Sequence, residues 1–465
     1  MNGSDRPLIF SGRLRYTPCQ RGGETMDILR KTRSVCPVCL RVLDAELEAR
    51  EDGIWLRKSC PEHGGFQVLV WEGSAESWRA WDRGNREKDR IAEAKTARKG
   101  CPRDCGLCEN HLRSGCCVLL ELTRKCDLRC PVCFAAAGGG NDADDPDLTE
   151  ISEQLDWLMA HGGPYNLQLS GGEPTRREDL PEILRMGREK GFTFFQLNTN
   201  GLRLAGEKGY AEALREAGLS TVFLQFDGLR DEIYTVLRGR PLLREKLAAI
   251  RRCADAGLGV VLVPTVTPGV NDRDLGDILR FAEKHMPQIR GVHFQPISYF
   301  GRCDLPGEQR RITIPALLRE IETQTGGRMK AEDFSGGSAE NPYCTIHASY
   351  MRVGGSLKPL RKRSGGSACA TSKASRENVA RQWSGPRLRV KTAEGLSAEI
   401  PSFDDFLAEA HDNTLAVSGM FFQDVYTLDL DRLQRCYVCE LDPRYGMVPF
   451  CAYNLTSLGG ESLYR

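Results

Sequence analysis

The chain has 465 residues, a formal net charge of +1, a hydrophobic content of 40% and a charged content of 27%. This length suggests about three domains of roughly 150 residues each, and the composition is that of a globular protein. A net charge near zero gives no electrostatic case for a nucleic-acid partner, and no run approaches the roughly 20 apolar residues of a membrane span. The start MNGSDRPLIF lacks the basic and apolar regions of a signal peptide, so we expect a cytoplasmic protein.

Cysteine is the outlier of the composition, with 19 in the chain. Without an export signal, closely spaced thiols bind metals more often than they form disulfides. The cysteines fall into four sets, and these sets suggest the domain organisation. We expect an N-terminal extension (1–30), a metal-binding domain (31–95), an auxiliary cluster segment (96–117), a catalytic core (118–330) and a C-terminal cluster domain (331–465).

The first set joins the pair Cys36 and Cys39 to Cys60 and His63, with 20 residues between the two pairs. Each pair forms a tight turn that presents two ligands, and two such turns suit one tetrahedral ion. Apolar residues at 54–56 and 68–71 predict short strands, so the pattern indicates a zinc-ribbon-like or rubredoxin-like domain. Spacing leaves two questions open: whether the ion is iron or zinc, and whether His63 or another thiol completes the site.

The second set, in GCPRDCGLCENH, consists of Cys101, Cys105 and Cys108, with Cys116 a few residues further on. Four thiols in such a short stretch favour a complete 4Fe–4S cluster over a single zinc ion. Cys117 is adjacent to Cys116 and is the alternative ligand. We prefer Cys116, because Cys117 begins an apolar run in which a thiol more often serves as a small core residue.

The third set, in CDLRCPVC, consists of Cys126, Cys130 and Cys133, and Gly171-Gly172-Glu173 follows further along the chain. Three thiolates on one loop can hold three irons of a 4Fe–4S cluster and leave the fourth iron open to a small molecule. The glycines allow close backbone approach, and Glu173 offers a carboxylate for an ammonium group. This combination resembles the radical S-adenosylmethionine enzymes. The alternative is a structural zinc site beside an ordinary glycine turn.

From the cysteine loop to about residue 330, strand and helix patterns alternate. Six βα units argue for a parallel sheet with right-handed crossovers, here a partial (β/α)6 barrel of the α/β class. Ligands of such sheets gather at the C-terminal ends of the strands, so we expect Asn198, Asn200 and Asp227 to contact S-adenosylmethionine together with residues 171–173. The predicted strands are 118–122, 167–169, 192–197, 221–226, 259–266 and 292–297, and the predicted helices are 151–159, 179–190, 205–217, 231–256, 271–285 and 314–323.

The last set is dispersed, with Cys344 in NPYCTIH followed by Cys436, Cys439 and Cys451. CYVC forms a two-ligand turn, and folding would bring in the other two thiols, which predicts a second auxiliary cluster. Residues 354–400 between these cysteines are basic and rich in Gly and Ser. Such a stretch is typical of a solvated loop, and contact with anionic lipid headgroups is the alternative.

The whole arrangement resembles the tetraether lipid synthases and their relatives. The stretches that carry the resemblance run in order over about 270 residues, and the later cysteines continue it. The first roughly 30 residues and residues 354–400 depart from the family pattern. The matching stretches are KTRSVCPVC, CPEHGGF, GCPRDCGLCENH, ELTRKCDLRCPVCFAAA, QLSGGEPTRRED, QLNTNGLRLA, QFDG and FQPISYFGR.

The resemblance implies a radical enzyme that joins unactivated sp³ carbons of lipid alkyl chains by means of a 5′-deoxyadenosyl radical. It also implies one mononuclear iron (or zinc), one radical 4Fe–4S cluster, two auxiliary 4Fe–4S clusters, a reductant such as ferredoxin or flavodoxin, and peripheral contact with the inner face of the membrane. Relatives assigned as pterin methyltransferases supply the alternative, radical methylation of a pterin-type substrate, and peptide modification is a further alternative. A non-enzymatic electron carrier fits poorly, because it has no use for an open iron.

Overall fold

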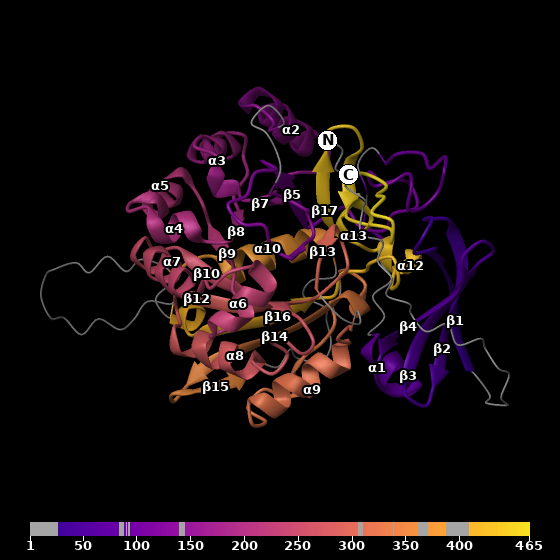
Figure 1. Cartoon of the computed structure of the whole chain (residues 1–465). Helices are drawn as coiled ribbons and strands as arrows, with labels where there is room; N and C mark the ends of the chain where they lie inside the picture. Colours follow the sequence, from indigo (N-terminus) through magenta and orange to yellow (C-terminus); the bar gives the residue numbers. More distant parts are fainter. Residues whose placement is uncertain are drawn as a thin grey trace, which may run out of the picture.

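The computed structural model contains three sheets among the described residues: a small N-terminal one, a large one that forms the core and a two-stranded one (Figure 1). Several stretches named above lie outside the described residues: Cys19 with nearly all of the N-terminal extension, Cys369, and the segments 361–370 and 387–400 of the basic stretch. The described residues are 27–82, 88–89, 91, 94–138, 145–305, 310–337, 339–360, 371–386 and 409–465.

The N-terminal sheet consists of four antiparallel strands that pair in chain order, joined by short turns. Leu47, Leu56 and Trp71 are buried on one of its faces, because side chains of a strand alternate between the two faces. The predicted short strands are parts of β3 and β4. The elements are β1 (Asp27–Val35), β2 (Val42–Arg50), β3 (Gly53–Cys60) and β4 (Gly64–Trp71), followed by α1 (Ala75–Trp81).

Six parallel strands form the centre of the large sheet, which confirms the predicted partial barrel. Their spatial order is β5-β7-β8-β9-β10-β12, and the sheet does not close on itself. Because both faces are covered, the strands are rich in Val, Leu and Phe. The strands are β5 (Cys117–Glu121), β7 (Asn166–Ser170), β8 (Phe195–Thr199), β9 (Thr221–Gln225), β10 (Gly259–Val263) and β12 (Ile289–Pro296).

The helices between these strands cover the outer face of the sheet (Figure 1). Two predicted helices are each divided in two. The division near residue 240 has a clear cause, since Gly239 ends the first helix in a left-handed conformation and Pro241 has no N–H to continue it. The helices are α2 (Leu148–Ala160), α3 (Leu180–Glu189), α4 (Leu202–Gly206), α5 (Tyr210–Ala217), α6 (Asp231–Arg238), α7 (Leu243–Asp255), α8 (Leu275–Lys284) and α9 (Ile314–Gln324).

The C-terminal residues extend the same sheet at both edges. One group of strands continues beyond β12 in the order β16-β14-β15, and another continues beyond β5 in the order β17-β18. The predicted C-terminal cysteines are therefore carried by strands, turns and a short helix attached to the core sheet. The stretch 354–400, which we expected to be a solvated loop, contains a strand and a helix in its described part. These elements are β14 (Thr345–Val353), β15 (Ser356–Pro359), α10 (Ser372–Trp383), β16 (Thr414–Met420), α12 (Leu430–Leu433), β17 (Val438–Asp442), β18 (Gly446–Pro449) and α13 (Phe450–Tyr453).

Three short strands complete the description. β11 (Thr265–Val266) pairs with β12, and β6 (Val132–Cys133), in the cysteine loop, pairs with β13 (Arg302–Cys303). Among the described helices, none combines the length and the apolar character needed to cross a bilayer.

The N-terminal sheet docks on the segment 424–431 through buried polar contacts. The Lys58 ammonium group donates to Ser34 Oγ (2.9 Å) and to the carbonyls of Val425 (2.7 Å) and Tyr426 (2.9 Å), and only 3% of this residue is exposed. On β1, the Thr32 hydroxyl donates to the Asp429 carboxylate at 2.7 Å. Because buried acceptors must be satisfied, these bonds fix the orientation of the sheet on the core.

We predict that Lys58→Met loosens this junction. The variant leaves the Val425 and Tyr426 carbonyls without their donor, and each buried unsatisfied acceptor costs about 1–3 kcal/mol. Amide hydrogen exchange in residues 53–60 and 424–431 should therefore accelerate by on the order of tenfold, as measured by mass spectrometry. The exposed Lys31→Met in the same sheet is the matched control and should leave these rates unchanged. Equal rates in both variants would contradict a docking role for Lys58.

Candidate active site and metal centres

The structure brings the first predicted ligand set together. The ligand atoms of Cys36, Cys39, Cys60 and His63 all lie within 4.8 Å of one another. His63 Nδ1 is 3.6 Å from the Cys36 sulfur and 3.4 Å from the Cys60 sulfur. The turn after β1 presents one pair, and the turn between β3 and β4 presents the other. Three sulfurs and one imidazole nitrogen at this separation fit a single tetrahedral ion.

The cysteine loop lies at the C-terminal end of β5, against the turn that follows β7. The Gly172 N–H donates to the Thr123 carbonyl at 2.7 Å, and the Glu173 N–H donates to the Lys125 carbonyl at 2.8 Å. A side chain at either glycine of this turn would overlap those carbonyl oxygens, and Gly171 also has a φ of 125°. The Gly-Gly pair is therefore required for the turn to hold the residues that enter the cysteine loop.

The Glu173 carboxylate joins the ends of β7 and β8. It accepts hydrogen bonds from the Thr175 N–H (3.1 Å) and hydroxyl (2.7 Å), from the Thr199 hydroxyl (2.7 Å) and from the Asn200 N–H (2.7 Å). Burial raises the pKa of Glu173, and these donors oppose that rise. The first effect of this side chain is therefore to fix the two turns that face the cysteine loop.

Asn200 carries the connection back to the cysteine loop. Its amide nitrogen donates to Asp127 at 2.6 Å, next to Cys126. Its carbonyl accepts from the buried Lys246 ammonium group at 2.6 Å, and burial lowers the pKa of Lys246 to about 8. Asn198, two residues earlier, accepts from Gln196 at 2.9 Å. Lys246, which the sequence did not suggest, thus stabilises the end of β8 through its hydrogen bond to the Asn200 backbone carbonyl.

Asp227, which we expected to contact S-adenosylmethionine, follows β9 and points toward Arg238. The Arg238 side chain, and not that of Asp227, lines the cavity. Asp227 is fully buried and forms two hydrogen bonds of 2.7 Å with the Arg238 guanidinium group. Sequence analysis missed Arg238. Its position in α6, four residues after the buried Tyr234, places it on the buried helix face, and an arginine there is a signal that could have been found.

The three thiols of the cysteine loop fit an iron–sulfur cluster. Cys126, Cys130 and Cys133 line one cavity together with residues 171–173. Burial raises the pKa of Cys126 to about 12 and also raises that of Cys130, which the neighbouring Arg238 cation opposes. These thiols favour their charged form only with a cation beside them, and iron would supply that charge.

In the second set, Cys101 and Cys105 are one pair of neighbouring thiols, and Cys108 is an electrostatic neighbour of Cys105. The thiols of Cys101 and Cys105 interact, and the Cys105 backbone N–H donates to the Tyr464 hydroxyl at 3.0 Å. Cys116 instead lies beside Cys117, with the two sulfurs 3.8 Å apart, and both line the cavity. The structure thus places both alternative ligands at the cavity wall. Each thiolate of a four-iron cluster binds a different iron, so cluster ligands need not lie as close as those of a single ion.

In the last set, three thiols are electrostatic neighbours. Burial, and then the nearby Cys344 thiol, raises the pKa of Cys436 to about 12. Burial, and then the nearby Cys436 thiol, also raises the pKa of Cys451. Arg432 donates to the Cys344 sulfur at 3.3 Å. Cys439 is fully buried among apolar side chains of the main core, with Cys436 and Cys117 as its neighbouring thiols.

The large cavity occupies the inside of the half-open barrel, with a volume of about 2340 Å³, its open mouth included. The central strands contribute three amides to its lining, those of Gln168, Gln225 and Gln295. Aromatic rings line it beside the cysteine loop and α13, where Phe450 packs against Phe422 with ring centroids 4.3 Å apart. The cavity therefore offers both hydrogen-bonding groups and apolar surfaces.

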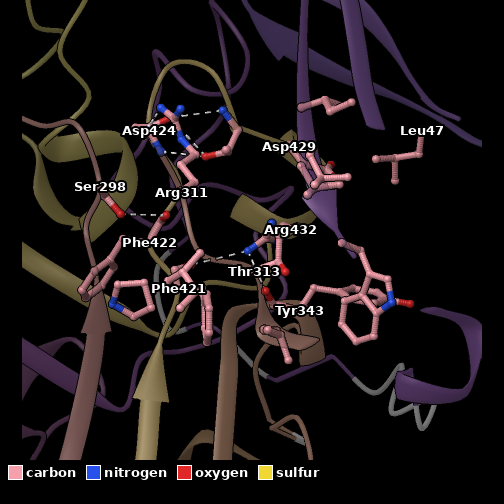
Figure 2. A pocket seen from close by; sticks show the side chains of 18 of the residues that line it. Leu47, Ser298, Arg311, Thr313, Tyr343, Phe421, Phe422, Asp424, Asp429 and Arg432 are labelled. Atoms are coloured by element: carbon pink, nitrogen blue, oxygen red, sulfur yellow. Dashed lines mark hydrogen bonds and ion pairs between the residues drawn. The ribbon is translucent and has the colours of Figure 1, made fainter. Parts of the chain in front are cut away.

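A second, smaller cavity lies between the N-terminal sheet and the core, with a volume of about 810 Å³ when its open side is included (Figure 2). Figure 2 shows Leu47 on one side of it and Phe421 and Tyr343 on another, with Arg311 and Asp424 paired at one end. The two cavities share four lining residues, so they adjoin each other at this wall. The shared residues are Pro296, Ile297, Ser298 and Phe422.

We predict that the first ligand set binds one metal ion independently of the cysteine loop. In the whole chain, Cys36→Ser combined with Cys39→Ser should lower the total metal content by about one ion per chain, because two of four ligands are lost. Elemental analysis checks this and also identifies the ion as iron or zinc. Cys253→Ala, which removes a thiol buried in α7, is the control and should retain the full content. Loss of several irons in the double variant would contradict an independent site.

Comparison with protein families identifies two parts of the chain. Residues 120–282 match the radical SAM superfamily, and residues 28–72 match the HMPTM N-terminal zinc ribbon domain. These matches confirm the radical S-adenosylmethionine core and the N-terminal metal-ribbon fold predicted from the sequence. A solved structure with a similar core is Streptococcus suis SuiB bound to S-adenosylmethionine, with a TM-score of 0.38, 18% identity, and coverage of 46% of this chain and 48% of that one.

Curated relatives extend the likeness beyond the core. The chain is 31% identical over 220 residues to the GTP 3′,8-cyclase of Paenarthrobacter nicotinovorans, covering 46% of this chain and 60% of that protein. It is 33% identical over 477 residues to the 7,8-dihydro-6-hydroxymethylpterin dimethyltransferase of Methanocaldococcus jannaschii, covering 91% of this chain and 93% of that protein. The protein is a radical S-adenosylmethionine enzyme, and it belongs to the family that includes this pterin dimethyltransferase.

Proposed function

We propose that this enzyme methylates a pterin-type heterocycle by radical chemistry. One molecule of S-adenosylmethionine and one electron give the 5′-deoxyadenosyl radical, which takes a hydrogen atom from the substrate carbon. A second molecule of S-adenosylmethionine donates its methyl group to that carbon radical, and a second electron from the reductant leaves S-adenosylhomocysteine. The observation that carries the proposal is the end-to-end likeness to the Methanocaldococcus jannaschii protein, at 33% identity over 91% of this chain and 93% of that one. The amides that line the cavity support this proposal. An amide group offers one acceptor and two donors, which suits the alternating N–H and C=O groups of a pyrimidinone ring. The alternative named from the sequence thus becomes the main proposal.

In this proposal Cys126, Cys130 and Cys133 hold the radical cluster. A four-iron cluster with one open iron supplies, when bound, the electron that cleaves S-adenosylmethionine to methionine and a 5′-deoxyadenosyl radical. The chain positions the co-substrate. The turn at residues 171–173 lies against the cysteine loop, and Asn198 and Asn200 present amides at the neighbouring strand end. A ferredoxin-like or flavodoxin-like protein is the proposed electron donor.

We further propose that Arg238 binds the carboxylate of S-adenosylmethionine. Arg238 lines the cavity and contacts the Cys130 thiol, and its Nη1 donates one long hydrogen bond of 3.4 Å to the Val132 carbonyl. Asp227 holds the other side of the guanidinium group, so the cation is already oriented before the ligand arrives. A fixed, buried cation is the natural partner for a carboxylate.

Arg238→Gln should therefore weaken S-adenosylmethionine binding by on the order of tenfold or more, since a hydrogen bond to a charged group contributes about 1.5–3 kcal/mol. Decarboxylated S-adenosylmethionine should bind wild type and variant with nearly equal affinity. Equilibrium dialysis of the anaerobic protein with both compounds makes the comparison, and the exposed neighbour Arg240→Gln is the control. If Arg238→Gln weakens both compounds equally, its role is to support the fold through Asp227, and the assignment fails.

A second candidate function is carbon–carbon bond formation between lipid alkyl chains, as the sequence resemblance implies. The observation that favours it is the apolar route from the cysteine loop. Phe134, Phe300, Phe422 and Phe450 line one side of the large cavity, and the adjoining second cavity continues the apolar surface toward the N-terminal sheet (Figure 2).

Product analysis separates the two candidates. Reconstituted enzyme is incubated anaerobically with S-adenosylmethionine, a reductant and either 6-hydroxymethyl-7,8-dihydropterin or a perdeuterated membrane lipid. We expect mass spectrometry to show one or two methyl groups added to the pterin, and Cys130→Ala, which removes a cluster thiol, should give none. Deuterium in 5′-deoxyadenosine together with a joined lipid product lacking two deuterium atoms, and no pterin product, would replace the main proposal by the second.

A further inference from the structure

Helix α10 closes the end of the large cavity that lies opposite the cysteine loop. The Asn166 side chain, at the start of β7, donates to the Arg376 carbonyl of α10 at 3.0 Å. Gly259, at the start of β10, faces Gly385 just after the helix so closely that a side chain there would collide with it. The cysteine loop follows the C-terminal end of β5, so α10 and this loop lie at opposite ends of the parallel strands.

One face of α10 lines the cavity. Five of its residues do so at the spacing of a single helix face, and the figure of the whole chain shows the helix lying across the middle of the sheet (Figure 1). Trp383 anchors this face, because its ring packs on Phe223 with centroids 4.7 Å apart and on His293 at 5.8 Å. The five lining residues are Ser375, Asn378, Val379, Gln382 and Trp383.

Asn378 differs from its polar neighbour on this face. The Gln382 amide donates to the Ser349 hydroxyl at 3.0 Å and is thereby engaged within the protein. Asn378 is half-buried at the cavity wall, and its amide makes no hydrogen bond to another described residue. An amide in this position offers a donor and an acceptor side by side to whatever fills the cavity.

We propose that α10 is the substrate-recognition helix and that the Asn378 amide binds the pyrimidinone edge of the heterocycle, with the ring beside Trp383. The inference deepens the proposed function and rests on it. A lactam edge presents an adjacent N–H and C=O, and one amide group can pair with both at once. The apolar rings of Trp383 and Phe223 supply a surface for the flat ring system. The opposite end of the cavity remains for S-adenosylmethionine and the cysteine loop.

The test uses Asn378→Leu, which keeps the shape of the side chain and removes its hydrogen-bonding groups. We expect the Kd for 6-hydroxymethyl-7,8-dihydropterin, measured by equilibrium dialysis with the complete anaerobic protein, to rise by about tenfold. The Kd for S-adenosylmethionine should change less than twofold, because its proposed site is at the other strand ends. Glu377→Gln, exposed on the same helix, is the matched control and should change neither affinity. Asn378→Asp, which retains only acceptors, should also weaken pterin binding.

Three results overturn the inference, and they differ from one another. If wild type and Asn378→Leu bind the pterin equally well, Asn378 does not recognise the heterocycle and the inference fails. The proposed function then still stands. If Asn378→Leu loses S-adenosylmethionine binding as well, Asn378 supports the fold. If wild type does not bind the pterin at all, the proposed function fails, and the recognition role fails with it.

Discussion

The site depends on two backbone hydrogen bonds between the turn after β7 and the residues that enter the cysteine loop. Gly172 and Glu173 donate to the carbonyls of Thr123 and Lys125, and no side chain fits between these backbones. Backbone donors and acceptors make this contact precise, because the strands on either side fix their positions. The loop that carries the three thiols is thereby held over the end of the sheet.

Buried charge extends this contact to the neighbouring strands. The Glu173 carboxylate connects the ends of β7 and β8, and Lys246 donates to the Asn200 carbonyl. Asp227 orients Arg238 near the end of β9. Each of these groups is buried, and a buried charge is tolerated only where hydrogen bonds or an opposite charge compensate it. The result is a rigid rim whose remaining donors face the cavity. Arg238 places one cation of this rim beside Cys130, a thiol that must become anionic to hold iron.

Because the central strands are parallel, two different groups of residues lie at the two ends of the cavity. Strand C-termini carry the cysteine loop, the Gly-Gly-Glu turn and Arg238, and the strand N-termini meet α10. The N-terminal sheet is attached from outside through Lys58 and Thr32, and it leaves the second cavity between itself and the core. Under the proposed function, S-adenosylmethionine and the heterocycle are therefore bound by different residues.

The sequence by itself determined the six parallel strands, the N-terminal metal-ribbon fold and the close ligand set of Cys36, Cys39, Cys60 and His63, because these features depend on short-range periodicity and on ligands within tight turns. Only the tertiary structure decided features that join distant segments. It divided helix 231–256 at Gly239, turned Asp227 toward Arg238, and placed the Cys116 and Cys117 sulfurs 3.8 Å apart at the cavity wall. It also inserted α10 into the barrel and added C-terminal strands to both sheet edges. Such pairings are set by the burial of side chains far apart in the chain, and no local spacing records them.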